Sequence, residues 1–315
     1  MITIHPNGSE PFSAGYKVAL TVGNFDGVHR GHAALIDACV SYGKAHEGVL
    51  PAAFCFTSHP HLGNGNGGRT LSTTEEKKER LAALGVSVLF LADFSDFRGM
   101  EPMTFLRDFV IRSFGAEAFF CGTDFRFGKD RAGDGETLTA VLREAGLCAA
   151  VVPDVLYDGE KISSTAIRRC LSDGDTERAN AMLDAPYSVR GTVSHGDEIG
   201  RSIGFPTANL SPDGEKLLPR RGVFCTRAEI GGKTFPAVTN VGVRPTVKDG
   251  LCETVESFLL EEPDAPLYGK EIKISFLHRI RDEMKFPDLT ALQRAIAEDA
   301  ARAKDYFAQN PFAAV

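Results

Sequence analysis

Two hydrophobic periodicities follow one another along the chain, and they predict two different domains. From about residue 18 to residue 183, short apolar runs typical of buried strands alternate with segments of helical spacing. The strand-like runs are 18–22, 48–56, 86–91, 116–121 and 147–153, and the helix-like segments are 74–84, 103–114 and 135–145. A capping box, Thr73 with Glu76, precedes the first of these helices. The alternation predicts a Rossmann-like α/β domain, with a parallel sheet covered on both faces and a ligand site at the C-terminal ends of its strands.

After Pro186 apolar and polar positions alternate with a period of two, which is typical of half-buried antiparallel strands. The apolar positions are Tyr187, Val189, Val193, Ile272, Ile274 and Phe276. Short strands separated by Gly and Pro predict a small antiparallel β-barrel. A final helix, 288–307, would cover part of it with one apolar stripe, formed by Leu289, Leu292, Ile296 and Phe307. We expect domains at 1–185 and 186–315.

Composition narrows the class of protein. At 315 residues the chain is longer than one core usually supports, in agreement with two domains. A net charge of −7, without any cluster of Lys and Arg, argues against a nucleic-acid partner. The seven cysteines are scattered and form no Cys-x-x-Cys pair, which favours small buried side chains in a reducing compartment. Without a signal peptide or an apolar run long enough to span a bilayer, we expect a cytoplasmic protein with no membrane partner; the oligomeric state stays open.

The densest motif is residues 23–32, G-N-F-D-G-V-H-R-G-H, where the first predicted strand passes into a helix. Its three glycines permit a tight turn. His29 and His32 are three residues apart, so on a helix they share a face beside the unpaired N–H groups of the first turn. The positive end of the helix dipole favours an anion there, which predicts a phosphate site. The alternative is a connecting turn with two surface histidines.

Two further segments carry charged and hydroxyl side chains. Residues 122–128, G-T-D-F-R-F-G, follow a predicted strand and combine Asp124 and Arg126 with two aromatic rings. Residues 162–168, I-S-S-T-A-I-R, are typical of a helix start whose hydroxyls cap backbone donors. Taken alone, the first segment is compatible with a loop that carries a surface ion pair, and the second with a well-capped helix.

The second half of the chain has its own dense motif, residues 200–209, G-R-S-I-G-F-P-T-A-N. Thr207 and Asn209 are two residues apart, so on an extended segment their side chains point to one side. A hydroxyl and an amide carbonyl are oxygen ligands suited to Mg²⁺, which completes its octahedron with phosphate and water. Turn chemistry at a strand end is the alternative.

Glu256 lies in a predicted strand, on the same face as Phe258 and Leu260. A carboxylate between apolar neighbours is costly, and partial burial would raise its pKa toward the range useful for a general base. A solvent-facing Glu at the rim of the barrel is the alternative.

Two glycine-containing segments imitate nucleotide motifs. Residues 63–68 satisfy G-x-G-x-x-G but follow His-Pro-His rather than a strand, so we expect a loop near the site. Residues 232–234, G-K-T, lack the upstream glycine of a Walker A loop, so we expect a polar hairpin turn.

With residues 23–32, 122–128 and 162–168 in this order, the N-terminal half resembles the nucleotidyltransferases with a G-x-F-D-G-x-H-x-G-H signature, and among them the bifunctional prokaryotic FAD synthetases. The resemblance implies direct in-line adenylyl transfer, in which His29 and His32 bind the triphosphate and stabilise charge on the pentavalent phosphorus. It also implies that Arg168 supplies fixed charge to the departing pyrophosphate. The nucleotide- or flavin-binding residues implied are Gly23, Asn24, Phe25, Asp26, Asp124, Arg126, Ser164 and Thr165.

The C-terminal half resembles riboflavin kinases, which share the motif at 200–209. The resemblance implies that Thr207 and Asn209 bind Mg²⁺ and ATP, and that Glu256 removes the proton from the terminal ribityl hydroxyl of the flavin. The further nucleotide- or flavin-binding residues implied are Gly200, Arg201, Asn240, Arg244 and Arg281, of which the last two could instead form surface ion pairs. Phe258 stands where many relatives have His.

The two resemblances together predict a bifunctional enzyme of FAD biosynthesis. Its substrates would be ATP, riboflavin and FMN, with Mg²⁺ carried by ATP and the flavin as substrate and product. One alternative is a monofunctional enzyme that retains the ligands of the other half. Another is a flavin-binding sensor or storage module without useful catalysis.

Overall fold

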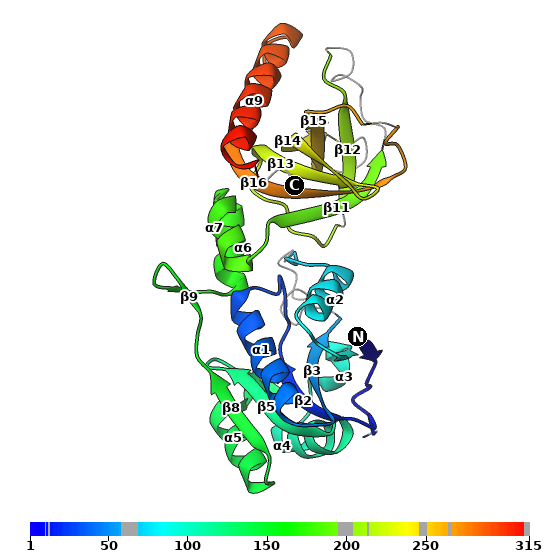
Figure 1. Ribbon diagram of the computed structural model, residues 1–315, viewed down its shortest axis with the longest axis vertical. Helices are drawn as coiled ribbons and strands as arrows, with labels where there is room; N and C mark the ends of the chain where they lie inside the picture. Colours follow the sequence, from blue (N-terminus) through cyan, green and yellow to red (C-terminus); the bar gives the residue numbers. More distant parts are fainter. Residues whose placement is uncertain are drawn as a thin grey trace. The chain divides into compact units, whose positions relative to one another are not determined.

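The alternating segments of the N-terminal half form a six-stranded parallel sheet with the order β1-β4-β3-β2-β5-β8 (Figure 1). The computed structural model describes residues 1–9, 11, 13–57, 69–194, 204–212, 214–245, 251–263 and 266–311. The strands are β1 (Ile2–Ile4), β2 (Lys17–Val22), β3 (Val49–Phe56), β4 (Val88–Ala92), β5 (Ala116–Gly122) and β8 (Cys148–Val152). The predicted parallel sheet is confirmed, and β1 adds an edge strand that the sequence pattern did not predict.

Helices cover both faces of this sheet. They are α1 (Arg30–Ala45), α2 (Thr74–Ala83), α3 (Phe94–Phe97), α4 (Pro102–Thr104), a π-helix η1 (Phe105–Ser113) and α5 (Gly135–Glu144). Successive residues of β3 point to opposite faces: Phe54 packs with Phe105 of η1, and Cys55 packs with Ile36 of α1 and Leu81 of α2. The capping box of α2 is confirmed, since Thr73 Oγ1 accepts from the Glu76 N–H and Glu76 Oε2 accepts from the Thr73 N–H.

The predicted helix at 103–114 is a short α-turn followed by the π-helix. The Phe114 N–H donates to the Phe109 carbonyl at 2.8 Å, and Ser113 Oγ donates to the Asp108 carbonyl at 2.7 Å, both across five residues. The wider turn directs five residues into the core, namely Phe105, Leu106, Phe109, Val110 and Ser113. The spacing of apolar residues in the sequence does not distinguish a π-helix from an α-helix, because both helices bury one face.

The C-terminal half contains a closed antiparallel barrel with the order β11-β12-β15-β14-β13-β16, as predicted. Its strands are β11 (Tyr187–Ser194), β12 (Thr207–Pro212), β13 (Gly222–Ile230), β14 (Lys233–Pro245), β15 (Leu251–Leu259) and β16 (Glu271–Asp282). The period-two residues predicted to be apolar are all buried: Tyr187, Val189, Val193, Ile272, Ile274 and Phe276. Gly231 and Gly232, both with positive φ, form the hairpin between β13 and β14, so the predicted polar hairpin turn is confirmed, at 231–232 rather than 232–234.

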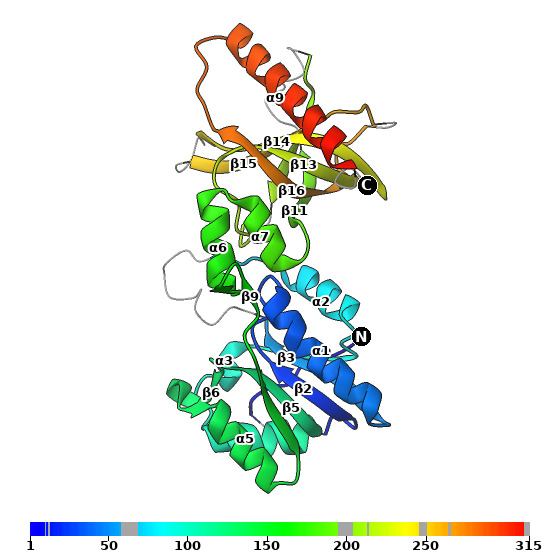
Figure 2. The ribbon, with the colours of Figure 1, turned by 60° about the vertical axis from the view of Figure 1, so that its left-hand side comes forward.

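The last helix, α9 (Leu289–Gln309), lies across the outside of the barrel (Figure 2). Its buried residues are Asp299, Ala300, Ala303 and Phe307. The predicted stripe is therefore only partly correct: Phe307 is buried, Leu292 and Ile296 are half-buried, and Leu289 is 56% exposed. Burial on the barrel is concentrated from Asp299 onward, so the first turn of the helix stays in contact with solvent.

Two helices, α6 (Ser164–Asp173) and α7 (Thr176–Leu183), precede the barrel. The chain divides into compact units at Met1–Ser164 and Thr165–Val315, about twenty residues before the predicted domain boundary. The division falls there because α6 and α7 pack with the barrel: Asn180 Nδ2 donates to the Phe276 carbonyl at 2.8 Å, and the Arg220 N–H donates to the Leu171 carbonyl at 2.8 Å. The boundary between catalytic domains stays a prediction.

Short hairpins complete the first unit, formed by β6 (Arg126–Phe127) with β7 (Gly133–Asp134) and by β9 (Leu156–Tyr157) with β10 (Glu160–Lys161); a 3₁₀ turn, η2 (Lys129–Arg131), lies within the first. Among the described residues no helix is long and apolar enough to cross a lipid bilayer. Cys39, Cys55, Cys121, Cys170 and Cys225 are buried free thiols, and Cys148 is an exposed one. The predicted loop at 63–68 lies outside the described residues.

Candidate active sites

The motif at 23–32 forms a sharp turn between β2 and α1. The Gly23 N–H donates to the Phe54 carbonyl at 3.1 Å, which ties the end of β2 to β3. Phe25 (φ 48°) and Val28 (φ 39°) take left-handed conformations that cost such residues about 1–3 kcal/mol each. Both side chains are buried in the core, which holds them in place. Of the three glycines only Gly27 has a positive φ, so the prediction that all three serve the turn is corrected.

His29 and His32 are stacked at the N-terminus of α1. His29 is the N-cap, and its Nδ1 accepts a hydrogen bond from the His32 N–H at 3.3 Å. The two ring centroids are 3.7 Å apart with an interplanar angle of 15°. A Cβ atom at position 31 would lie 3.2 Å from the His29 ring, so Gly31 provides room for the imidazole rather than backbone freedom. The predicted pair is thus brought together at the N-terminus of the helix.

Both imidazoles are neutral at pH 7. His29 is 6% exposed, and burial lowers its pKa to about 4, against the opposing charges of Asp26 and Asp124. Burial, with the neighbouring His29 and Lys77, lowers the pKa of His32 well below its ordinary value. Each ring therefore has one N–H to donate, and the pair acts toward an anion as hydrogen-bond donors aided by the helix dipole.

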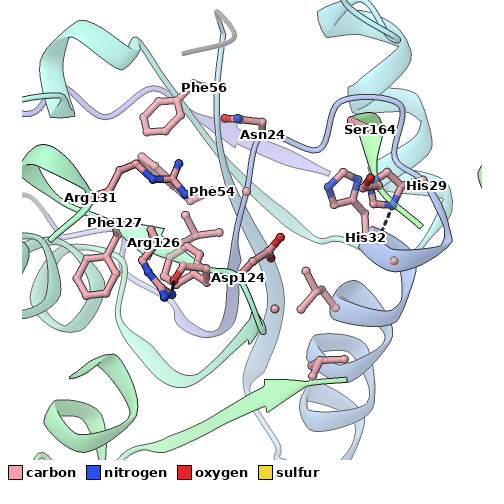
Figure 3. A pocket seen from close by; sticks show the side chains of 18 of the residues that line it. Asn24, His29, His32, Phe54, Phe56, Asp124, Arg126, Phe127, Arg131 and Ser164 are labelled. Atoms are coloured by element: carbon pink, nitrogen blue, oxygen red, sulfur yellow. Dashed lines mark hydrogen bonds between the residues drawn. The ribbon is translucent and has the colours of Figure 1, made fainter. Parts of the chain in front are cut away.

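A cavity of about 430 Å³ lies in front of the imidazole pair. Figure 3 shows His29, His32 and Ser164 at one end, with Phe54, Phe56, Phe127, Arg126 and Arg131 at the other and Asn24 and Asp124 between them. Gly23 also lines the cavity. The structure thus brings five predicted residues of this half into the same cavity as the imidazole pair, namely Gly23, Asn24, Asp124, Arg126 and Ser164.

Two charged residues beside Asp124, Lys161 and Asp154, line the cavity and were not predicted from the sequence. Lys161 Nζ lies 3.1 Å from Asp124 Oδ2 and 2.9 Å from Asp154 Oδ1, and Thr123 Oγ1 donates to Asp154 at 2.7 Å. Burial opposes the charged form of Lys161, but the bonds to Asp154 and Asp124 outweigh it and raise the pKa of the ammonium. The only sequence signal was the position of Lys161 directly before the I-S-S-T segment.

The other end of the cavity is aromatic and cationic. Its aromatic lining consists of Phe54, Phe56, Phe94, Phe97, Phe105, Phe125 and Phe127. Phe125 and Phe127 stack with ring centroids 5.5 Å apart. Arg126 and Arg131 lie at the same end, and Arg98 also lines the cavity; of these only Arg126 was predicted. Such a surface suits a flat ring system that carries an anionic group.

Phe25 and Asp26 do not line the cavity. Phe25 is fully buried, and its ring meets His32 edge-on at 5.1 Å. Asp26 is 2% exposed. Its carboxylate accepts hydrogen bonds from the N–H groups of Leu71 and Ser72 at 2.9 and 3.1 Å. Ser164 Oγ in turn donates to the Asp26 carbonyl at 2.9 Å. These residues build the turn and position the segment that leads into α2.

Thr165 and Arg168 follow Ser164 on α6 and belong to the second unit. Thr165 is exposed, and Arg168 is half-buried. Their predicted contacts with phosphate stay predictions.

In the second unit, predicted residues form one row across the outer face of the barrel. Asn209 of β12 lies opposite Glu256 of β15, which lies opposite Asn240 of β14. Asn240 lies opposite Val223 of β13, and Val223 lies opposite Arg281 of β16. Directly opposed residues point to the same face, so Glu256 has an amide on each side.

Thr207 adjoins this row, two residues from Asn209 and opposite Phe258. Glu256 and Phe258 are half-buried and alternate with Val255 and Ser257, which point into the barrel and are fully buried. The predicted shared face of Glu256 and Phe258 is confirmed. Hydroxyl, amide and carboxylate oxygens on one face fit a Mg²⁺ ion that is also held by phosphate. Among the described residues, no three His, Cys, Asp or Glu side chains converge to hold a metal by themselves.

Arg281 ends the row in a buried ion pair with α9. Its Nε and Nη2 bond to the two oxygens of Asp299 at 2.7 to 3.1 Å, and the Asp299 side chain is only 4% exposed. The guanidinium also lies 5.7 Å from the ring centroid of Phe286. Of the other predictions, Gly200 and Arg201 lie outside the described residues, as does the side chain of Arg244.

The two halves of the chain match two known families in the same order. Residues 13–166 match the family model described as FAD synthetase, and residues 183–307 match that described as Riboflavin kinase. The bifunctional riboflavin kinase/FMN adenylyltransferase of Escherichia coli (strain K12) is 35% identical over 293 residues, which are 91% of this chain and 92% of the relative. The protein of that name from Bacillus subtilis (strain 168) is 34% identical over 92% of this chain and 93% of its own.

A solved structure titled as a macrolide-efflux protein from Streptococcus pneumoniae shares 28% identity and a TM-score of 0.86, over 96% of this chain and 99% of that one. The folds and the family matches define a class of protein in which an α/β nucleotidyltransferase unit is followed by a kinase-type barrel. The chain belongs to the bifunctional riboflavin kinase/FMN adenylyltransferase family.

Proposed function

We propose that the C-terminal domain phosphorylates riboflavin with ATP to give FMN, and that the N-terminal domain adenylylates FMN with a second ATP to give FAD and pyrophosphate. The observation that carries the proposal is the presence in one chain of a neutral imidazole pair at a helix N-terminus and a Glu256-centred polar row on a barrel. Full-length similarity to bifunctional relatives supports it.

In the adenylyl transfer, an FMN phosphate oxygen forms a bond to the α-phosphorus of ATP while the bond to the β-phosphate oxygen breaks. The N–H groups of His29, His32 and the first turn of α1 donate to the phosphate oxygens as charge develops on them. Lys161 adds a positive charge to the cavity beside Asp124. The aromatic end, with Arg126 and Arg131, takes the flavin ring and its phosphate. For Thr165 and Arg168 the phosphate roles stay predictions from the family resemblance.

In the kinase reaction, Glu256 accepts the proton of the terminal ribityl hydroxyl, whose oxygen attacks the γ-phosphorus of ATP and releases ADP. Thr207 and Asn209 would hold Mg²⁺, and the row places Asn209 next to the base. When bound, the ion neutralises charge on the phosphates. Positioning by the rigid barrel supplies the rest of the catalysis.

We assign the adenylyltransferase to residues 1–185 and the kinase to residues 186–315. The substrates are then the small molecules ATP, riboflavin and FMN. The free cysteines of the described residues, five of six buried, support a reducing compartment, and we place the protein in the cytoplasm.

The test is a time course with riboflavin, ATP and Mg²⁺, with flavins separated by chromatography. We expect FMN to appear first and FAD to follow. Absence of both products rejects the proposal. FMN without FAD, or FAD made only from added FMN, identifies a monofunctional enzyme. Tight flavin retention without ATP consumption identifies a storage protein.

A further inference from the structure

Glu283, which follows β16, occupies the side-chain space of a glycine on β14. A Cβ atom at position 242 would lie 2.5 Å from Glu283 Oε1 and 3.1 Å from Asn240 Nδ2. Gly242 does not have a positive φ, so its backbone does not require glycine. The missing side chain instead leaves room for the Glu283 carboxylate beside the Asn240 amide. Glu283 itself is exposed, so a solute can reach it.

The residues before Glu283 are held firmly. Asp299 binds the Arg281 guanidinium through both carboxylate oxygens. Arg281 Nη1 donates to the Asp282 carbonyl at 3.0 Å, and Arg279 Nη2 donates to the Asp282 carboxylate at 2.5 Å. The chain therefore leaves β16 in a fixed direction, which brings Glu283 over Gly242.

The strand order indicates which substrate Glu283 faces. Gly242 lies opposite Thr254, so it is on the same face as Glu256, one strand further from β12. The proposed Mg²⁺ ligands Thr207 and Asn209 are on β12, on the other side of the proposed base. An in-line displacement places the attacking and leaving oxygens on opposite sides of the phosphorus. With ATP on the β12 side, the flavin approaches from the β14 side.

We propose that Glu283 is a riboflavin-binding residue of the kinase site, which accepts a hydrogen bond from a ribityl hydroxyl and so directs the terminal hydroxyl toward Glu256. The proposal rests on the proposed kinase function. A carboxylate suits this role because it only accepts, whereas a polyol chain offers several donors. Asn240, beside it, can both donate and accept.

Two variants test the contact from its two sides. Glu283→Gln keeps the shape but removes the charge, and Gly242→Ala displaces the flexible end of Glu283 without altering it. Loss of a charge-assisted hydrogen bond weakens binding roughly 10- to 100-fold. We expect KM for riboflavin to rise by about that factor in both variants, with KM for MgATP unchanged. Glu271→Gln, an exposed glutamate at the other end of β16, is the matched control and keeps wild-type values.

FAD formation from added FMN, measured on the same samples, reports the integrity of the other domain. A Glu283→Gln enzyme with wild-type KM for riboflavin overturns the inference, as does a rise in KM for MgATP instead. If a variant does not turn over, riboflavin binding is measured by fluorescence quenching, and unchanged affinity likewise overturns it. A wild-type chain that makes no FMN would refute the kinase function itself, which separates the two failures.

Discussion

Asn209 lies directly opposite Glu256 on the neighbouring strand of the barrel. Side chains opposed in this way have Cβ atoms about 5 Å apart, so an amide and a carboxylate from these positions can reach one phosphoryl group. The proposed metal ligand and the proposed base are thus positioned by the same pair of strands, and they can be separated by mutation.

Glu256→Gln removes the proposed base but keeps the shape of the side chain. We expect FMN formation to slow by about 10²- to 10⁴-fold, because general-base catalysis contributes that much. FAD formation from added FMN continues at the wild-type rate. Both rates are measured by chromatography of flavin products. Near-normal kinase turnover in this variant would show that Glu256 is not the base.

Asn209→Ala removes the proposed Mg²⁺ ligand. We expect the Mg²⁺ concentration for half-maximal FMN formation to rise about tenfold or more, since the loss of groups that merely support a metal ligand already costs 10- to 100-fold in affinity. The Mg²⁺ dependence of FAD formation from FMN in the same preparation serves as the control. An unchanged Mg²⁺ requirement for FMN formation contradicts the assignment.

His29→Ala combined with His32→Ala removes both neutral donors at the N-terminus of α1. Each donor to developing charge contributes about 10²- to 10³-fold, so FAD formation is expected to stop on the assay time scale. FMN then accumulates from riboflavin, because the kinase site is separate. Loss of both activities would contradict this division of labour and is checked in one time course.

Features that depend on a few neighbouring residues could be predicted from the sequence. The capping box of Thr73 and Glu76 is local, and the proximity of His29 and His32 is expected from their three-residue spacing at the start of a helix. Alternation of apolar runs also sufficed for the parallel sheet, because strands buried on both faces are uniformly apolar. The period-two pattern predicted the barrel because successive side chains of a strand point to opposite faces, of which one is buried.

Features that depend on which distant segments meet could not be predicted. Lys161 joins Asp124 only because the β9–β10 hairpin folds back to the cavity, and Asp299 meets Arg281 only because α9 crosses β16. The aromatic lining of the cavity likewise combines residues from β3, η1 and β6. The roles of Phe25 and Asp26 in the turn were hidden because a buried residue of a motif is indistinguishable in sequence from one that touches the ligand.

The depressed pKa of His29 makes the stability of the N-terminal unit depend on pH. The native imidazole titrates at about 4, against an ordinary value of 6.5, so below pH 6.5 the unfolded state binds a proton that the native state does not. The contribution of His29 to the free energy of unfolding is therefore fully present above pH 6.5. About 3 kcal/mol of it is lost as the pH falls toward 4. His29→Asn keeps an N-cap acceptor without titrating. We expect its free energy of unfolding in urea to fall less over this range; parallel curves for both proteins would contradict it.

Breaking the Asp299–Arg281 pair leaves one charge buried without its partner. The Asp299 side chain is 4% exposed and that of Arg281 is 18% exposed, so Asp299→Ala is expected to lower the free energy of unfolding of the barrel by about 3–5 kcal/mol. Replacing both residues, Asp299→Leu with Arg281→Met, removes the uncompensated charge and restores most of the loss. Urea denaturation followed by far-ultraviolet circular dichroism measures both variants, with FAD formation from FMN as the control for the other unit. A double variant no more stable than Asp299→Ala would mean that α9 depends on the ion pair itself rather than on the avoidance of a buried charge.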